Sequence, residues 1–162
     1  MLQLSGEYEC KVDAKGRMMF PSRLRKQLEE VLHFGLMLNR DLFEKCLVLY
    51  PKPEWDRVNQ EMSRLSRYDR EHMEFRRRFI NGATLLELDS AGRLLIPAAL
   101  LNYAEIDLKK SNDLIVSGLG EVIEIWSKQS RENMLSNPSD LNALTSKVRK
   151  DIDRGSPGHL MN

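Results

Sequence analysis

The order of apolar and polar residues near the start of the chain predicts a β-hairpin. Apolar and polar side chains alternate over residues 10–13, which is the period of a half-buried strand. Gly16 tolerates a positive φ, and Asp13 can accept bonds from backbone N–H groups just ahead of it, so a turn is expected there. A second extended run follows at 17–20. We therefore predict a tight hairpin.

A helix and two further strands are predicted after this hairpin. Pro21 suits the first turn of a helix, because the N–H group that proline lacks is not needed there. Apolar residues then recur at helical spacing and form one face, at Leu24, Leu28, Val31 and Leu32. Two extended apolar runs follow at 36–40 and 46–50.

The same order of residues recurs 76 positions later in the chain. Asp13-Ala-Lys-Gly-Arg17 aligns with Asp89-Ser-Ala-Gly-Arg93, and Pro21 aligns with Pro97. We therefore predict two copies of one unit, an intervening connector and an appendix, at 7–55, 83–131, 56–82 and 132–162.

The second copy is predicted to repeat the elements of the first. It has a hairpin around Gly92, a short helix from Pro97, and strands at 114–117 and 122–126 on either side of a glycine turn at 118–120. A unit of about fifty residues is too small to bury a good core alone. Two copies in one chain can interleave their hairpins and share a core.

Helical periodicity also marks the connector. The pattern starts at Pro53 and can end at Asn81-Gly82, which predicts two helices or one bent helix. Its apolar and aromatic face consists of Trp55, Val58, Met62, Leu65, Tyr68, His72, Phe75 and Phe79. On this face we expect His72 to be packed in the core.

The appendix is predicted to contain two helices and a loose tail. The first helix starts near Ser127 and is broken at Asn137-Pro138. Ser139 is expected to cap the second, and the tail begins at Arg154. The apolar face of the second helix consists of Leu141, Leu144, Val148 and Ile152.

Charge is concentrated in the first hairpin and the helix after it. The 162 residues include 25 Lys and Arg and 24 Asp and Glu, for a net charge of +1. The window 11–26 holds one acidic residue, Asp13, and six basic ones, Lys11, Lys15, Arg17, Arg23, Arg25 and Lys26. This window is therefore +5, and the rest of the chain is −4. The total averages a basic segment with an acidic remainder.

The doubled motif resembles the MraZ family of bacterial transcriptional regulators. The stretches that carry the resemblance are EYECKVDAKGRMMFPSRLRKQL, LLELDSAGRLLIPAALLNYA, CLVLYPKPEW and VIEIWSKQS, within about residues 5–135. The resemblance implies an α+β fold. Two AbrB-like swapped-hairpin units would share one β-barrel-like core, with added connecting and C-terminal helices.

The same resemblance implies a function. Family members bind double-stranded DNA at short repeated elements upstream of the operon for cell division and cell-wall synthesis, which usually includes their own gene. They assemble into ring-like homo-oligomers, and the arginine of Asp-x-x-x-Arg is associated with DNA contact. Arg17 and Arg93 occupy that position here. A cytoplasmic, nucleoid-associated protein without a cofactor, a small-molecule substrate or a membrane partner is implied.

The chemistry of the basic residues is compatible with this role. A two-stranded ribbon fits a major groove, where arginine can bond a guanine edge, and the other basic side chains would hold phosphates. The candidate DNA-binding residues are Lys11, Lys15, Arg17, Arg23, Arg25, Lys26 and Arg93. Asp13, Gly16, Asp89 and Gly92 are assigned to hairpin structure. A solvated charged face, with each Arg paired locally to its Asp, is the alternative interpretation.

The second copy departs from the first after its proline. Ala98, Ala99 and Leu101 stand where the first copy has Ser22, Arg23 and Arg25. We therefore expect the first copy to supply most of the electrostatic affinity for DNA.

Other classes of function have little support in the sequence. His33, His72 and His159 lie far apart, and none has a partner at metal-ligand spacing. No phosphate-binding loop or nucleophile motif is present, so we expect no enzyme. The start lacks a secretory pattern, no run of residues could span a bilayer, and Cys10 and Cys46 are expected to be reduced thiols.

Two alternative functions use the same fold differently. A ring-forming scaffold would bind a protein partner and no specific DNA. An antitoxin would carry the same DNA-binding unit, but such proteins usually hold one unit per chain with a toxin-binding tail.

Overall fold

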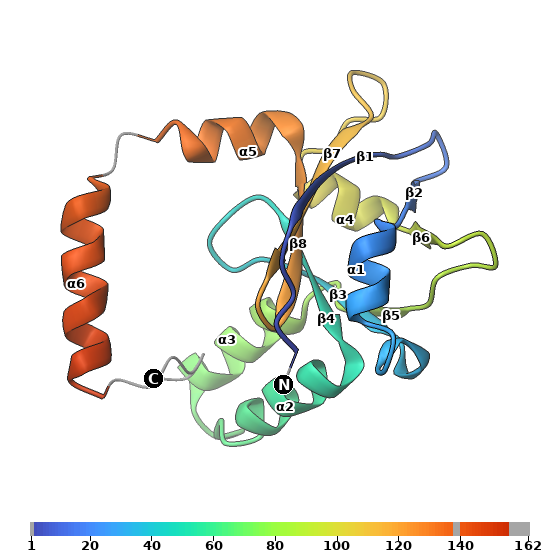
Figure 1. Ribbon diagram of the computed structural model, residues 1–162. Coiled ribbons are helices and arrows are strands. Elements are labelled where there is room, and N and C mark those ends of the chain that lie inside the picture. Colours follow the sequence, from blue (N-terminus) through green and yellow to red (C-terminus); the bar gives the residue numbers. More distant parts are fainter. Residues whose placement is uncertain (1, 138–139, 156–162) are drawn as a thin grey trace.

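The computed structural model describes residues 2–137 and 140–155 (Figure 1). Its strands form two antiparallel sheets, one six-stranded with the order β1-β7-β8-β4-β3-β5 and one consisting of β2 and β6. The strand bounds are β1 Glu7–Lys11, β2 Arg17–Met19, β3 Leu36–Arg40, β4 Leu47–Pro51, β5 Thr84–Leu86, β6 Arg93–Leu95, β7 Asp113–Leu119 and β8 Val122–Ser127.

The two repeats pair with each other strand by strand. β1 of the first repeat pairs with β7 of the second, and β5 of the second pairs with β3 of the first. β2 pairs with β6 around Met18 and Leu94, and β4 pairs with β8 around Val48 and Glu124. Both central pairs join residues 76 positions apart, so the two repeats are related by an approximate twofold axis.

The predicted tight hairpins therefore differ from the observed ones. Within the first hairpin the strands meet only at a bridge between Val12 and Met18 and at the bond from the Asp13 N–H to the Arg17 carbonyl. Beyond these contacts, β1 and β2 each pair with the other repeat. Local alternation predicts that a segment is extended, but it does not specify its partner.

One hydrophobic core contains side chains from both repeats. The first repeat contributes Met18 and Leu24 among others, and the second contributes Leu94, Leu100 and Val116. All five are fully buried or nearly so. The core lies between the six-stranded sheet, the β2–β6 pair and helices α1 and α4. β1 and β5 are the edges of the six-stranded sheet, and the Val12–Met18 bridge lies between β1 and the β2–β6 pair.

The helices after the two prolines are short. α1 spans Ser22–Gln27 after Pro21, and α4 spans Ala98–Tyr103 after Pro97. The expected helix through residue 32 is wrong, because α1 ends at Gln27 and a 3₁₀ helix, η1, follows at Leu32–Phe34. The apolar side chains of Leu28, Val31 and Leu32 still pack on the core, because a chain of turns and a 3₁₀ helix, with three residues per turn, can keep them on one side.

The connector forms two helices, α2 at Lys52–Met62 and α3 at Arg70–Ile80. A second apolar cluster, built on Trp55, Val58, Met62 and Phe79, packs them together. The expectation of a buried His72 is wrong. Its side chain is 44% exposed, and its Nδ1 accepts the backbone N–H of Ser66. Tyr68 is fully exposed in the turn between the helices.

The glycine turn of the second repeat lies later than predicted. β7 runs through Gly118 to Leu119, and the turn falls at Gly120 and Glu121. The backbone at Leu4 and Ser5 passes so close to Gly118 that an added methyl group would lie 2.5 Å from the Ser5 nitrogen. Gly118 is thus required by close packing rather than by a turn.

The appendix contains α5 at Lys128–Leu135 and α6 at Leu141–Asp153. The Ser127 hydroxyl caps α5 by accepting the Ser130 N–H, which confirms the predicted start of this helix near Ser127. Asp140 caps α6, and the predicted cap Ser139 lies outside the described residues, as does the tail from 156. α6 stands apart from the rest of the molecule (Figure 1). Within 2–137 and 140–155, no helix has the length and apolar character needed to cross a membrane.

Candidate nucleic-acid interface

The first hairpin turn is organised by one carboxylate. Asp13 Oδ1 accepts the backbone N–H groups of Lys15 and Arg17, each at 2.9 Å, and Oδ2 accepts Arg17 Nε at 2.9 Å. Gly16 has a φ of +86°, which other residues rarely adopt. These bonds lower the pKa of Asp13, and the bond from the Arg17 N–H is the largest cause.

The second turn has the same geometry. Asp89 Oδ1 accepts the N–H groups of Ala91 and Arg93, and Oδ2 accepts Arg93 Nε, all at 2.9 Å. Gly92 has a φ of +79°. The pKa of Asp89 is lowered, chiefly by the bond from the Arg93 N–H. Each Asp therefore holds its turn and fixes the orientation of one guanidinium group.

Both arginines keep donors for a ligand. The Nε of Arg17 and that of Arg93 are bonded to aspartate, and about a third of each side chain is exposed. A guanidinium group has five N–H donors, and its terminal nitrogens are the ones that bond a guanine edge. The Asp–Arg pair thus presents an oriented arginine at the tip of each hairpin.

Each turn is hydrogen-bonded to the backbone of the other repeat. The Phe20 N–H donates to the Gly92 carbonyl at 3.1 Å, and the Ile96 N–H donates to the Gly16 carbonyl at 2.8 Å. Phe20 and Ile96 are equivalent positions, so these two bonds obey the approximate twofold axis. The pairing brings the two turns to the same end of the molecule.

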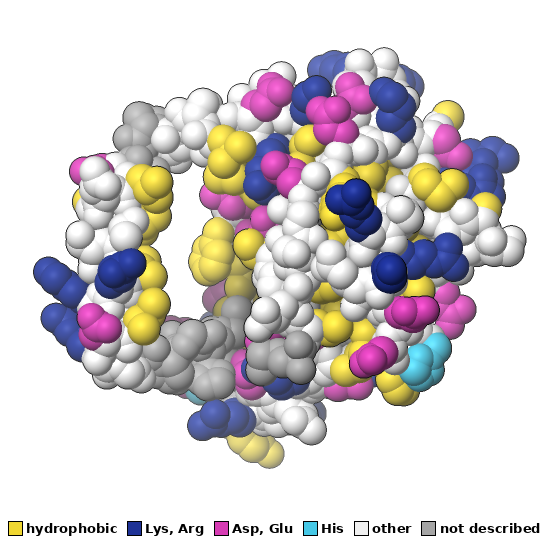
Figure 2. Space-filling view, viewed as in Figure 1, with side chains coloured by type: hydrophobic (Ala, Val, Ile, Leu, Met, Phe, Trp, Pro, Cys, Tyr) yellow, Lys and Arg dark blue, Asp and Glu magenta, His cyan; other side chains and the backbone are white. Residues whose placement is uncertain are grey.

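The other candidate basic residues lie around these turns and differ in whether, among the described residues, their side chains are free or ion-paired. Lys15 is exposed on the first turn, and Arg23, Arg25 and Lys26 are exposed on α1. Lys11 forms an ion pair with Asp113 at 2.7 Å. Figure 2 shows Lys and Arg side chains along the side of the molecule that carries α1 and the hairpins.

A surface groove of about 540 Å³ adjoins the second turn. Its lining includes Lys11, Met19, Arg23, Arg25 and Gly92. These residues come from the first repeat except for Gly92. The first repeat therefore supplies basic side chains beside the turn of the second, which the linear sequence does not indicate.

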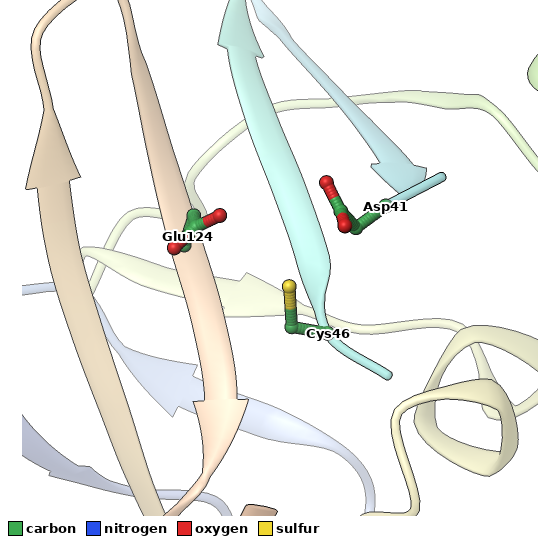
Figure 3. A group of neighbouring side chains, drawn as sticks. All are labelled: Asp41, Cys46 and Glu124. Atoms are coloured by element: carbon green, nitrogen blue, oxygen red, sulfur yellow. The ribbon is translucent and has the colours of Figure 1, made fainter. Parts of the chain in front are cut away.

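The structure also joins three polar residues that the sequence analysis did not connect. Oxygen atoms of Asp41 and Glu124 and the sulfur of Cys46 lie within 4.8 Å of one another, and the thiol points between the carboxylates (Figure 3). Asp41 directly follows β3, Cys46 directly precedes β4, and Glu124 lies in the middle of β8. Asp41 and Cys46 are close in sequence, but only the pairing of β4 with β8 brings Glu124 to them, so local spacing did not indicate this cluster of possible metal ligands.

This polar cluster has protein partners of its own. Asp41 Oδ2 accepts the N–H groups of Phe43 and Glu44, and Glu124 Oε1 accepts Trp126 Nε1. Burial is the main cause that raises the pKa of the Cys46 thiol and that of the Glu124 carboxyl. Metal binding requires a thiolate, whereas these surroundings favour the thiol.

This is a two-repeat protein: its chain carries two fused copies of one strand–turn–strand unit, and each copy presents an arginine held by an aspartate. The family model described as "MraZ protein, putative antitoxin-like" matches residues 3–78 and 79–154. These two matches begin 76 residues apart, the offset of the internal repeat. The chain belongs to the MraZ family.

Relatives from several bacteria support this membership. A protein of Christiangramia forsetii is 41% identical over 140 residues, covering 86% of this chain and 88% of its own. One from Flavobacterium psychrophilum is 41% identical over 137 residues and covers 85% of each. One from Bacteroides thetaiotaomicron is 32% identical over 155 residues, covering 95% and 97%. All three are named transcriptional regulator MraZ.

Proposed function

We propose that this chain is a sequence-specific DNA-binding transcriptional regulator and that its role is binding rather than catalysis. The observation that carries the proposal is the pair of Asp–Arg turns presented at the same end of the molecule. The strand exchange between the repeats is interpreted as the AbrB-type swapped-hairpin arrangement. The names of the relatives agree with this function.

In the proposed mechanism, the two hairpin tips enter the major groove of duplex DNA. Arg17 and Arg93 contact base edges, because their aspartates hold the guanidinium planes in place. Lys15, Arg23, Arg25 and Lys26 contact phosphates. Lys11 contributes less, since a phosphate would have to displace Asp113.

The proposed target consists of repeated elements upstream of the chain's own cell-division and cell-wall operon. One chain offers few phosphate contacts, so a homo-oligomer that binds several elements gains affinity through effective concentration. The proposed oligomer is ring-like, and DNA binding would place it on the nucleoid.

The exposed face of α6 supports self-association. Its four apolar side chains, Leu141, Leu144, Val148 and Ile152, are 72%, 52%, 45% and 66% exposed. Figure 2 shows apolar side chains of this helix facing an open space beside the body of the molecule. A helical stripe of this kind is usually covered by another apolar surface.

A salt series of DNA binding tests the proposed function. The probe is a duplex from upstream of the chain's own gene, and a duplex of the same composition in shuffled order is the control. We expect tighter binding to the upstream duplex, with affinity that falls as salt rises. Arg17→Ala and Arg93→Ala should reduce the preference for the upstream duplex. Equal binding to both duplexes at every salt concentration would contradict the proposal.

A protein-binding scaffold without a DNA target is the second candidate, and the exposed face of α6 favours it. This scaffold would form the oligomer without preferring the upstream duplex. A mass measurement in solution, combined with the salt series, separates the two candidates.

A further inference from the structure

The contacts around Gly16 and Gly92 show that each hairpin turn packs against the short helix of the other repeat. A methyl group added to Gly16 would lie 3.4 Å from Cδ1 of Leu101, which is on α4. A methyl group added to Gly92 would lie 2.8 Å from Nη1 of Arg25, which is on α1. Backbone hydrogen bonds connect the turns to the other repeat in the same way: the Ile96 N–H donates to the Gly16 carbonyl, and the Phe20 N–H donates to the Gly92 carbonyl.

Arg25 and Leu101 are equivalent positions of the two repeats, since they are 76 residues apart. The approximate twofold axis therefore gives the two turns different neighbours. The turn of the first repeat receives an almost fully buried leucine, 6% exposed. The turn of the second repeat receives an exposed arginine. The exchange therefore places the arginine of the first repeat at the second turn, while the first turn has a leucine at the equivalent place.

The environment of Arg25 suits an anionic ligand. Among residues 2–137 and 140–155, the guanidinium group of Arg25 has no hydrogen-bond or ion-pair partner. Its guanidinium group lies beside Gly92, with Nη1 2.8 Å from where a methyl group on Gly92 would be. Arg93, on the same turn, is already oriented by Asp89 at 2.9 Å. A second guanidinium group beside it adds positive charge that a DNA phosphate would neutralise.

We propose that Arg25 belongs to the DNA contact of the second turn, where it binds a backbone phosphate while Arg93 contacts a base edge. This inference rests on the proposed function and deepens it. The first turn then acts through Lys15 and Arg17, and the second through Arg25 and Arg93. Three of these four basic side chains, Lys15, Arg17 and Arg25, belong to the first repeat, so the second turn depends on the first repeat for its phosphate contact.

The test is a pair of double-mutant cycles on binding to the upstream duplex. One cycle combines Arg25→Ala with Arg93→Ala, and the other combines Arg25→Ala with Arg17→Ala. Residues that share a contact are coupled, whereas distant ones act independently. We therefore expect the double variant of Arg25 and Arg93 to lose less affinity than the product of the single losses. The losses of Arg25 and Arg17 should multiply.

The salt dependence tests the kind of contact. Arg25→Ala should weaken binding about 3- to 10-fold on every duplex and lower the slope of log affinity against log salt by about 1. Arg25→Lys keeps the charge and should retain the slope. Arg77→Ala removes an exposed arginine from α3 and should change neither the affinity nor the slope. Thermal melting of each variant verifies that it is folded.

The outcomes separate this inference from the proposed function. Coupling of Arg25 to Arg17, or additive losses in both cycles, would overturn the placement of Arg25 while leaving the regulator intact. A wild-type chain that does not prefer the upstream duplex would overturn the proposed function. In that case the cycles can be repeated on any duplex at low salt, and a chain that binds no duplex would overturn both.

Discussion

Met18 lies directly opposite Leu94 in the β2–β6 pair, and both side chains are fully buried. These two residues hold the same position in the two repeats. Their contact therefore lies on the approximate twofold axis that interleaves the halves, and it joins the hairpins that carry Arg17 and Arg93. The core and the candidate DNA-binding surface depend on the same strand pair.

Removing the Met18 side chain should destabilise both halves together. Met18→Ala leaves a cavity in a core shared by the repeats, so we expect the free energy of unfolding to fall by about 2–5 kcal/mol. Urea denaturation should show one transition, because neither half has a core of its own. The matched control is Met19→Ala on the same strand, which is 55% exposed and should cost less than about 0.5 kcal/mol. Two separate transitions would contradict a shared core.

Replacing Gly16 should cost more than replacing another glycine with positive φ. Any alanine in that backbone conformation costs about 1–2 kcal/mol. At Gly16 the new methyl group would also lie 2.9 Å from the carbonyl oxygen of Ile96, the residue that follows β6. At Gly120, with a φ of +77°, no atom lies within 4 Å of the same position. Chemical denaturation of Gly16→Ala and Gly120→Ala therefore separates backbone strain from collision. Equal losses would show that the close approach has no effect.

The turn aspartates should make stability depend on acid pH. Folding lowers the pKa of Asp13 and Asp89, so each carboxylate stabilises the fold above its unfolded pKa. That contribution is lost as pH falls through the lower, folded pKa, between roughly pH 5 and pH 2. The variant Asp13→Asn with Asp89→Asn should melt at lower temperature at pH 7 and show a smaller decrease toward acid. Melting temperatures measured across this range provide the comparison, and an unchanged acid dependence would contradict it.

Charges placed on the apolar face of α6 should disrupt self-association. Leu144→Asp combined with Val148→Asp puts two carboxylates on a face that is 45–72% exposed in a single chain. If that face packs on another copy, the mass measured by light scattering should drop toward that of one chain, without loss of the melting transition of the core. Ser146→Asp adds a charge to the polar side of the same helix and should leave the mass unchanged. An oligomer that persists in the double variant would exclude α6 as the contact.

Much of the local structure could be predicted from the sequence because its causes are local. The repeat of Asp-x-x-Gly-Arg predicts two turns, since a short carboxylate side chain reaches the N–H groups that follow it and glycine accepts the positive φ. Pro21 and Pro97 mark the starts of two helices for an equally local reason. The errors also had local causes. Residues 28–34 share their apolar spacing with a helix but form turns and a 3₁₀ helix, and Gly118 indicated a turn that lies two residues later.

Local patterns along the chain are enough to show two equivalent units, the places of their turns, and the residue types at each tip. Which strands pair, that the carboxylates of Asp41 and Glu124 meet the Cys46 thiol, and that Arg25 lies beside the turn of the other repeat all depend on tertiary packing. Periodicity specifies which face of a segment is buried but not what covers it. Residues 67 positions apart, such as Arg25 and Gly92, lie close together only because the two repeats share one core.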